Sequence, residues 1–183
     1  MEQTPRANRI HIGIYGRCNS GKSSLINAIT GQQTAVVSEV AGTTTDTVNK
    51  SMELPGVGAV TFIDTAGFDD TGELGAKRLE QTRKAADRTD VAVIVHAGGE
   101  PGAEREWIGL FGERNIPVVL VLNKADLLND EAAAVSALRA ETGINPIAVS
   151  ALTGKGIGEL IAAIAEAGRG ATDEVSITGN LAG

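Results

Sequence analysis

The chain has 183 residues, a length typical of one domain, and its net charge of −7 argues against unspecific attraction to nucleic acid or anionic lipid. Cys18 is the only cysteine, which excludes an intramolecular disulfide and a cluster held by cysteines alone. No apolar run is long enough to cross a membrane, and residues 1–8 lack the apolar segment of a secretory signal, so we expect a cytoplasmic protein with no membrane partner.

Short β-branched runs alternate with helical patterns along the chain, which predicts an α/β fold with a six-stranded, mainly parallel sheet and helices on both faces. The predicted strands cover residues 9–15, 47–54, 59–63, 91–95, 117–122 and 146–149. The predicted helices cover residues 22–30, 74–87, 103–114, 130–142 and 158–166. The link over residues 55–58 is too short for a crossover helix and predicts one antiparallel strand. We expect an N-terminal extension over 1–8, one domain over 9–167, and a linker or the start of a further domain over 168–183.

The segment Gly16–Ser23 fits the pattern G-x4-G-K-S of a phosphate-binding loop, and it lies between a predicted strand and a predicted helix. Backbone N–H groups of such a loop surround phosphate oxygens, and Lys22 adds a positive charge for the β- and γ-phosphates. The hydroxyl of Ser23 is placed to coordinate Mg²⁺. A glycine turn with a surface lysine is the alternative, and the strand–loop–helix context argues against it. The candidate phosphate contacts are Gly16, Asn19, Ser20, Gly21, Lys22, Ser23 and Ser24.

Two further segments have the features of γ-phosphate sensors. Asp64 ends an apolar strand and can hold the Mg²⁺ shell, and Gly67 can bring its N–H group against the γ-phosphate. The threonine run in Gly42–Asp46 supplies a Mg²⁺ ligand, for which Thr44 is the first choice and Thr43 the second. A capped turn and a β-forming run are the alternatives. We predict that both segments are switch regions that the γ-phosphate orders.

The tetrapeptide Asn123–Asp126 predicts recognition of guanine. The Asp126 carboxylate can accept hydrogen bonds from guanine N1–H and the exocyclic amine, which adenine does not offer together. Lys124 can lie along the base, and Asn123 can tie this loop to the phosphate loop. A helix cap is the alternative for Asn123 and Asp126. After the last strand, Ser150, Ala151 and Leu152 form a second candidate contact, in which the Ala151 N–H donates to guanine O6.

Together these motifs resemble the translation-factor-related class of P-loop GTPases, particularly the group that holds the tRNA-modification and ribosome-assembly GTPases. A narrower likeness, to the GTPase domain of the FeFe-hydrogenase maturation GTPases, rests on the segments Thr4–Arg9, Gly42–Asp46, Phe68–Gly75 and Asp173–Leu181. Thr45 departs from that likeness, because relatives usually carry arginine there. The resemblance implies assembly or delivery of the hydrogenase metallocluster, with other maturation proteins as partners. Such proteins continue into dimerisation and cluster-binding domains, so we expect no iron–sulfur cluster in this chain and leave a homodimer open.

The resemblance also implies that Asn19 binds K⁺, with backbone carbonyls near Ser38 and Val40 completing the site, although Asn19 can instead brace the loop. Phe68 stands where many signalling GTPases have a water-positioning glutamine. By analogy with the tRNA-modification relatives, Glu73 is the candidate for that role, one residue out of register. A solvated glutamate is the alternative.

We therefore predict a Mg²⁺-dependent, K⁺-stimulated hydrolysis of GTP to GDP and phosphate, with Lys22, Thr44, Gly67 and Glu73 as the catalytic candidates. A binding module gated by GTP or GDP, and a GTPase of tRNA modification or ribosome assembly, are the alternatives. An ATP-using kinase or transporter subunit is disfavoured by Asp126. Arg17 and His96 carry no predicted chemical role: Arg17 occupies a variable loop position, and His96 follows a strand with no ligand pattern beside it.

Overall fold

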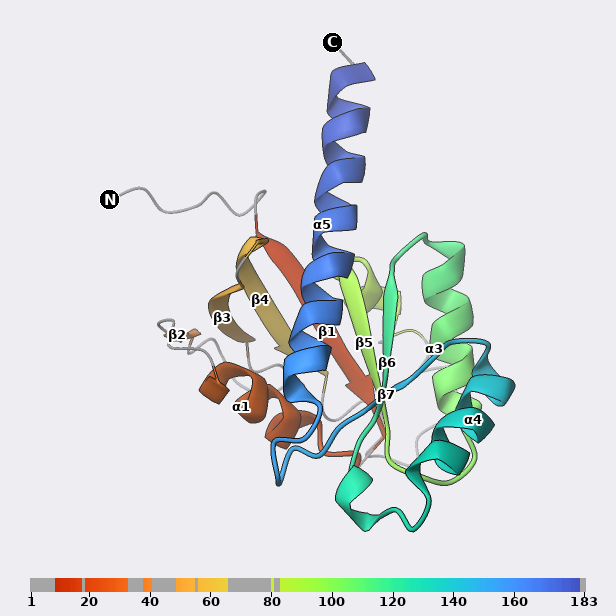
Figure 1. The fold of residues 1–183 in the computed structure, drawn as a ribbon. Helices are drawn as coiled ribbons and strands as arrows, with labels where there is room; N and C mark the ends of the chain where they lie inside the picture. Colours follow the sequence, from red (N-terminus) through yellow and green to blue (C-terminus); the bar gives the residue numbers. More distant parts are fainter. Residues whose placement is uncertain are drawn as a thin grey trace.

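The computed structural model describes residues 9–17, 19–32, 38–40, 49–54, 56–65, 80 and 83–181. Within them, seven strands form one sheet in the order β2-β3-β4-β1-β5-β6-β7. β3 runs antiparallel to both of its neighbours, and the other adjacent strands run parallel, so the mainly parallel sheet is confirmed (Figure 1). The strands are β1 (Ile10–Gly16), β2 (Ser38–Val40), β3 (Asn49–Leu54), β4 (Gly58–Asp64), β5 (Val91–His96), β6 (Val118–Leu122) and β7 (Ile147–Ala148).

β2 is absent from the prediction, so the sheet has seven strands rather than six. Its three residues pair antiparallel with β3, where Val40 lies opposite Asn49. A run of this length is too short to show the alternation that marks a strand in a sequence. The other six strands agree with their predicted ranges to within one residue at each end that the structure describes.

A tight turn joins β3 to β4, as the short link predicts. The Val57 N–H donates to the carbonyl of Leu54 at 3.1 Å, and Gly56 and Gly58 have φ angles of 84° and 100°. Glycine adopts such angles without a Cβ clash, which explains the two glycines of the turn. The predicted hairpin is confirmed.

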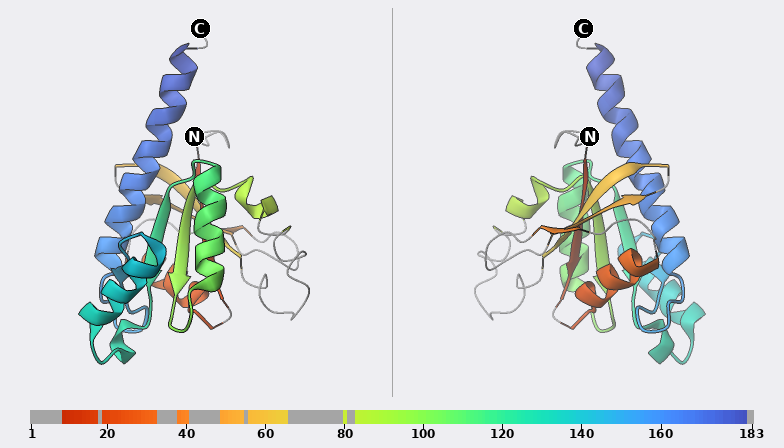
Figure 2. Two further views of the ribbon diagram at one scale, coloured as in Figure 1. Left: turned by 90° about the vertical axis from the view of Figure 1, so that its right-hand side faces the viewer. Right: turned by 90° about the vertical axis from the view of Figure 1, so that its left-hand side faces the viewer.

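Helices cover both faces of the sheet (Figures 1 and 2). They are α1 (Lys22–Gln32), α3 (Gly102–Glu113), α4 (Glu131–Thr142) and α5 (Ile157–Leu181), with a short 3-10 helix η2 (Ala125–Leu127). β5 shows the two faces by its alternation: Val91, Val93 and Val95 pack into one core with α1 and α5, whereas Ala92 and Ile94 pack into the other with α3 and α4. Parallel strands buried on both faces read as continuous apolar runs, as β5 does.

One predicted helix is described only in part, and another is longer than predicted. Of the helix predicted over 74–87, the structure describes residues 80 and 83–87, and residues 80 and 83–86 are helical. α5 continues to Leu181, far past the predicted end at residue 166. Gly168 and Gly170 are poor helix formers that break the helical pattern of the sequence, which is why the sequence indicates a linker there.

The far end of α5 extends beyond the sheet (Figures 1 and 2). The assignment of residues 168–183 to a linker or a further domain stays a prediction, and residues 1–8 lie outside the described part. Among the described residues, no helix is long and apolar enough to cross a membrane.

The parallel direction of β1, β4, β6 and β7 brings their carboxyl ends to one edge of the sheet. In open α/β sheets, ligands bind at this edge. Each of these strands is followed there by a predicted motif: the phosphate loop, Asp64, the loop that begins at Asn123, and Ser150.

Candidate functional site

The phosphate loop connects β1 to α1 and is closed by its own backbone. The Ser20 N–H donates to the Arg17 carbonyl at 3.0 Å, and Asn19 and Gly21 have φ angles of 65° and 93°. Gly16 leaves no room for a side chain, because a Cβ there would lie 2.5 Å from the Ser20 hydroxyl and 3.0 Å from the Val95 carbonyl. The loop is therefore closely packed at Gly16. Cys18 lies outside the described residues.

Lys22 is buried at the centre of this loop. Its Nζ donates to the carbonyl of Gly16, and it lies 3.2 Å from the carbonyl of Arg17. An ammonium group held in this way places a positive charge inside the loop, next to the positive end of α1. The arrangement suits the binding of a phosphate chain.

Ser23 and Asp64 meet at the sheet edge, although they are 41 residues apart. The Ser23 hydroxyl donates to Asp64 Oδ2 at 2.9 Å, and Asp64 is 5% exposed. A hydroxyl and a carboxylate are hard oxygen donors of the kind that Mg²⁺ prefers, so the two residues fit the predicted metal role. The other sensors, Thr43, Thr44 and Gly67, lie outside the described residues, as does Glu73.

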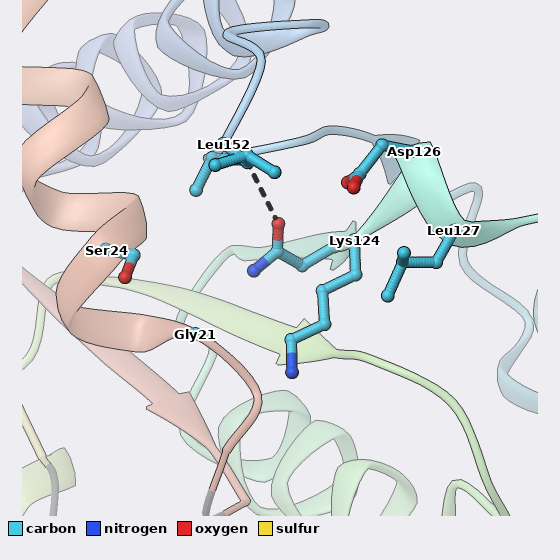
Figure 3. Close-up of a pocket in the computed structure, with 8 residues that line it drawn as sticks. Gly21, Ser24, Lys124, Asp126, Leu127 and Leu152 are labelled. Carbon is cyan, nitrogen blue, oxygen red and sulfur yellow. Dashed lines mark hydrogen bonds between the residues drawn. The ribbon is translucent and has the colours of Figure 1, made fainter.

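A pocket of about 450 Å³ lies beside the loop (Figure 3). Its lining comes from three places: the phosphate loop with the first turn of α1, the loop after β6, and the turn after β7. The lining residues are Gly21, Ser24, Asn123, Lys124, Asp126, Leu127, Ala151 and Leu152. Seven of these eight residues are predicted nucleotide contacts, so the structure brings the separate motifs into one cavity.

Asp126 is oriented by a neighbour that the sequence does not pair with it. The buried Ser150 hydroxyl donates to Asp126 Oδ1 at 2.8 Å, and the Thr153 N–H donates to that hydroxyl at 3.1 Å. Ser150 thus fixes one carboxylate oxygen of Asp126. The position of Ser150 after the last strand is the sequence signal, but its partner follows only from the fold.

Backbone and side chains tie the two loops together. The Lys124 Nζ donates to the Asn19 carbonyl at 2.6 Å, and Lys124 itself has a φ of 60°. The Ala151 N–H, predicted to meet guanine O6, points to Asn123 Oδ1 at a long 3.4 Å (Figure 3). The Ala151 donor therefore lies at the pocket and makes only a weak contact within the protein.

Two leucines give the pocket exposed apolar walls. Leu152 is 85% exposed and Leu127 is 73% exposed. Leu152 is a predicted nucleotide contact, whereas Leu127 is not among the predicted contacts. The position of Leu127 directly after Asp126 is the feature of the sequence that could have indicated it.

The K⁺ site that the resemblance implies stays a prediction. The side chain of Asn19 is exposed in the phosphate loop, but Ser38 and Val40 belong to β2 at the edge of the sheet. β3 and β4 lie between β2 and β1.

Comparison with known proteins is consistent with this geometry. Residues 11–124 match the family described as 50S ribosome-binding GTPase. The chain is 37% identical over 152 residues to the tRNA modification GTPase MnmE of Xanthomonas oryzae pv. oryzae, covering 82% of this chain and 32% of that protein. It is 40% identical over 136 residues to GTPase Der of Wolinella succinogenes, covering 72% of this chain and 28% of that protein.

The chain thus spans about a third of the length of these two relatives. Among solved structures, a variant of Aquifex aeolicus Era bound to GDP and AlF4⁻ superposes with a TM-score of 0.66 at 25% identity. That match covers 85% of this chain and 56% of the Era chain.

Proposed function

The chain belongs to the 50S ribosome-binding GTPase family, and we propose that it acts as a Mg²⁺-dependent switch that binds and hydrolyses GTP through the pocket described above. One observation carries the proposal: a single cavity joins Gly21 of the phosphate loop to Asp126 of the loop after β6. A nucleotide placed there meets phosphate-binding and base-reading groups together. Family membership establishes the GTPase class; the residue roles are the proposal.

The phosphate end of the site stabilises charge. Lys22 and the N–H groups of the loop compensate the charge that develops as water attacks the γ-phosphorus and the bond to the bridging oxygen breaks. The products are GDP and inorganic phosphate, with release of a proton. Mg²⁺ would be held by Ser23 and Asp64, where it supplies neutralisation of the β- and γ-phosphate oxygens. Thr44 and Gly67 sense the γ-phosphate, and Glu73 positions the water.

The base end of the site selects guanine. Ser150 holds one oxygen of Asp126, and the carboxylate retains acceptor capacity for the guanine N1–H and amine. Adenine would leave this acceptor unpaired, which costs about 1–3 kcal/mol or more for a charged group. Lys124 and Leu152 supply surface against the base.

We further propose that the switch serves assembly or delivery of the FeFe-hydrogenase metallocluster, with other maturation proteins as partners in the cytoplasm. The support is the likeness of the segments Gly42–Asp46, Phe68–Gly75 and Asp173–Leu181. A specific observation favours a second candidate, a role in tRNA modification: 37% identity over 152 residues to a tRNA modification GTPase. K⁺ stimulation, with Asn19 as ligand, and homodimer formation belong to the same proposal.

Hydrolysis is tested by phosphate release from GTP in Mg²⁺. The Lys22→Ala variant is expected to lose turnover by at least about a hundredfold, because the charge at the centre of the loop is removed. Lys84→Ala, at an exposed lysine outside the site, is the matched control and should keep the rate of the unchanged protein. Equal turnover in Lys22→Ala and the unchanged protein would contradict the proposal.

The cellular role is tested by introducing Lys22→Ala into the full-length protein in cells. Loss of hydrogenase activation, with tRNA modification intact, supports the first candidate. Loss of tRNA modification, with hydrogenase activation intact, overturns it in favour of the second. The gating alternative is tested by partner affinity in GDP and in a non-hydrolysable GTP analogue, where a difference indicates gating.

A further inference from the structure

An ion pair between the half-exposed Arg17 and the buried Glu104 joins the phosphate loop to α3. The guanidinium of Arg17 donates from Nε to Oε1 of Glu104 and from Nη2 to Oε2, both at 2.9 Å. Glu104 lies in the first turn of α3 and is 1% exposed. The guanidinium also donates to the backbone carbonyl of Glu100. Two parallel contacts of this kind fix the plane of the guanidinium as well as its position.

His96 adds a third side-chain contact to the carboxylate, so that Arg17, Glu104 and His96 form a cluster. Its Nδ1 lies 3.0 Å from Glu104 Oε2, and both side chains are buried. Oε2 therefore has two side-chain partners, Arg17 and His96, and Oε1 accepts from Arg17. The backbone carbonyl of His96 accepts from the N–H of Asn123 at 2.8 Å, so the cluster is also connected to the loop that reads the base.

Glu104 is charged in its buried position. Burial by itself raises the pKa of its carboxyl, but the hydrogen bonds from His96 and Arg17 outweigh that and hold the pKa below its ordinary value. The other buried residues of α3 are Trp107 and Phe111, which pack in the apolar core. Apolar residues in place of a buried ion pair often stabilise a fold just as much. Stability alone therefore does not explain why a charged residue occupies position 104.

The main chain of Arg17 connects the cluster to the phosphate loop. Its carbonyl accepts from the Ser20 N–H at 3.0 Å and lies 3.2 Å from Lys22 Nζ. Arg17 thus contacts Glu104 through its side chain, while its backbone closes the loop and contacts the lysine that meets the phosphates. A fixed guanidinium restrains the rotation of this peptide.

We propose that Glu104 and His96 are positioning residues that hold Arg17, and through its carbonyl Lys22 and the phosphate loop, in the shape that receives the nucleotide. The inference rests on the proposed GTPase function. It assigns a role in nucleotide binding to two residues that lie outside the pocket, and it gives Arg17 a function distinct from direct contact with phosphate.

The test compares Glu104→Gln with Glu106→Gln, an exposed glutamate on the same helix. Glutamine keeps the size of the side chain but removes the charge that Arg17 and His96 share. Calorimetric titration with GDP in Mg²⁺ is expected to show affinity roughly tenfold lower for Glu104→Gln and unchanged for Glu106→Gln. The preference for GDP over ADP should be unchanged in both variants, because Asp126 and Ser150 are intact. General unfolding would instead lower the affinities for GDP and ADP and also weaken the preference for GDP.

A double substitution makes the test independent of folding defects. Arg17→Met removes the half-exposed partner and leaves Glu104 bonded to His96, so this variant is expected to fold and to lose affinity about as much as Glu104→Gln. If the residues act as a unit, Arg17→Met with Glu104→Gln should lose little more than either alone. The inference would be overturned if the fold-loss of GDP affinity in the double variant equalled the product of the two single losses. It would also be overturned if both single variants bound GDP as tightly as the unchanged protein. No GDP binding by the unchanged protein would instead contradict the proposed function.

Discussion

The side-chain amide of Asn123 donates to the backbone carbonyl of Ser20 at 2.8 Å, across 103 positions of the sequence. Asn123 is buried at the end of β6, and Ser20 is buried within the phosphate loop. The contact fixes the loop that reads the base against the loop that holds the phosphates. The distance between the two halves of the pocket is therefore set before a nucleotide binds, which reduces the ordering cost of binding.

This relationship makes Gly21 sensitive to substitution. Gly21 has a φ of 93°, and a Cβ there would lie 2.4 Å from Asn123 Nδ2. We expect Gly21→Ala to displace Asn123 and to lower GDP affinity by roughly tenfold or more, measured by calorimetric titration. Gly31→Ala is the matched control, because nothing lies within 4 Å of a Cβ at that position of α1. Equal affinity in the two variants would show that the contact between the loops is unimportant.

Removal of the Asp126 carboxylate should lower affinity for GTP and raise affinity for ATP, because adenine would no longer leave a charged acceptor unpaired. The expected loss for Asp126→Ala is about 2–3 kcal/mol, or roughly 30- to 150-fold, because two charge-assisted hydrogen bonds disappear. Ser150→Ala should cause a smaller loss, since it only frees the carboxylate to rotate. Competition against a fluorescent GDP measures both variants. Glu141→Ala, an exposed acidic position on α4, serves as the control. An Asp126→Ala variant that still prefers GTP would contradict the assigned role.

Replacing Na⁺ by K⁺ at equal ionic strength should raise the rate of GTP hydrolysis several-fold if Asn19 is a K⁺ ligand. Asn19→Ala should remove that difference. Asn115→Ala is a close control, because Asn115 is also exposed and has a similar φ of 58°. The same turnover in both salts would remove the K⁺ role.

Tyr15 is the only tyrosine, so its ionisation can be followed alone by the near-ultraviolet absorbance of tyrosinate. Burial raises its pKa from 10.0 to about 12, and the hydrogen bond with Thr89 offsets only part of that effect. Between these two values the unfolded chain binds fewer protons than the folded one, so stability falls as pH rises. The total loss is about 3 kcal/mol. Tyr15→Phe should abolish the absorbance change and flatten this part of the stability profile. A midpoint near 10 in folded protein would contradict the burial argument.

The sequence predicts the sheet and the pocket well because both depend on local patterns. The alternation in β5 and the spacing of the motifs at Gly16 and Asn123 place loops at strand ends, and parallel strands bring those loops to one edge. Contacts between distant side chains are not visible in such patterns. Arg17 and Glu104 are 87 residues apart, and they meet because β1 and β5 are neighbours in the sheet.

The same reasoning explains the other differences. β2 is too short to show a pattern, and its pairing with β3 is a tertiary contact. In α5, Gly168 is buried close to Val57 of the β3–β4 turn. Glycine weakens an isolated helix, but at this position its lack of a side chain allows the helix to pack closely against the turn. Because glycine has a low helix propensity, the sequence pattern predicts a helix end before Gly168.

The central claim is that one pocket holds the phosphates and selects guanine, and competition between nucleotides tests it most directly. Labelled GDP is bound to the protein in Mg²⁺ and displaced by increasing GTP or ATP. The account predicts that GTP displaces the label at concentrations at least about a hundredfold lower than ATP. Displacement by ATP and GTP at the same concentration would contradict it.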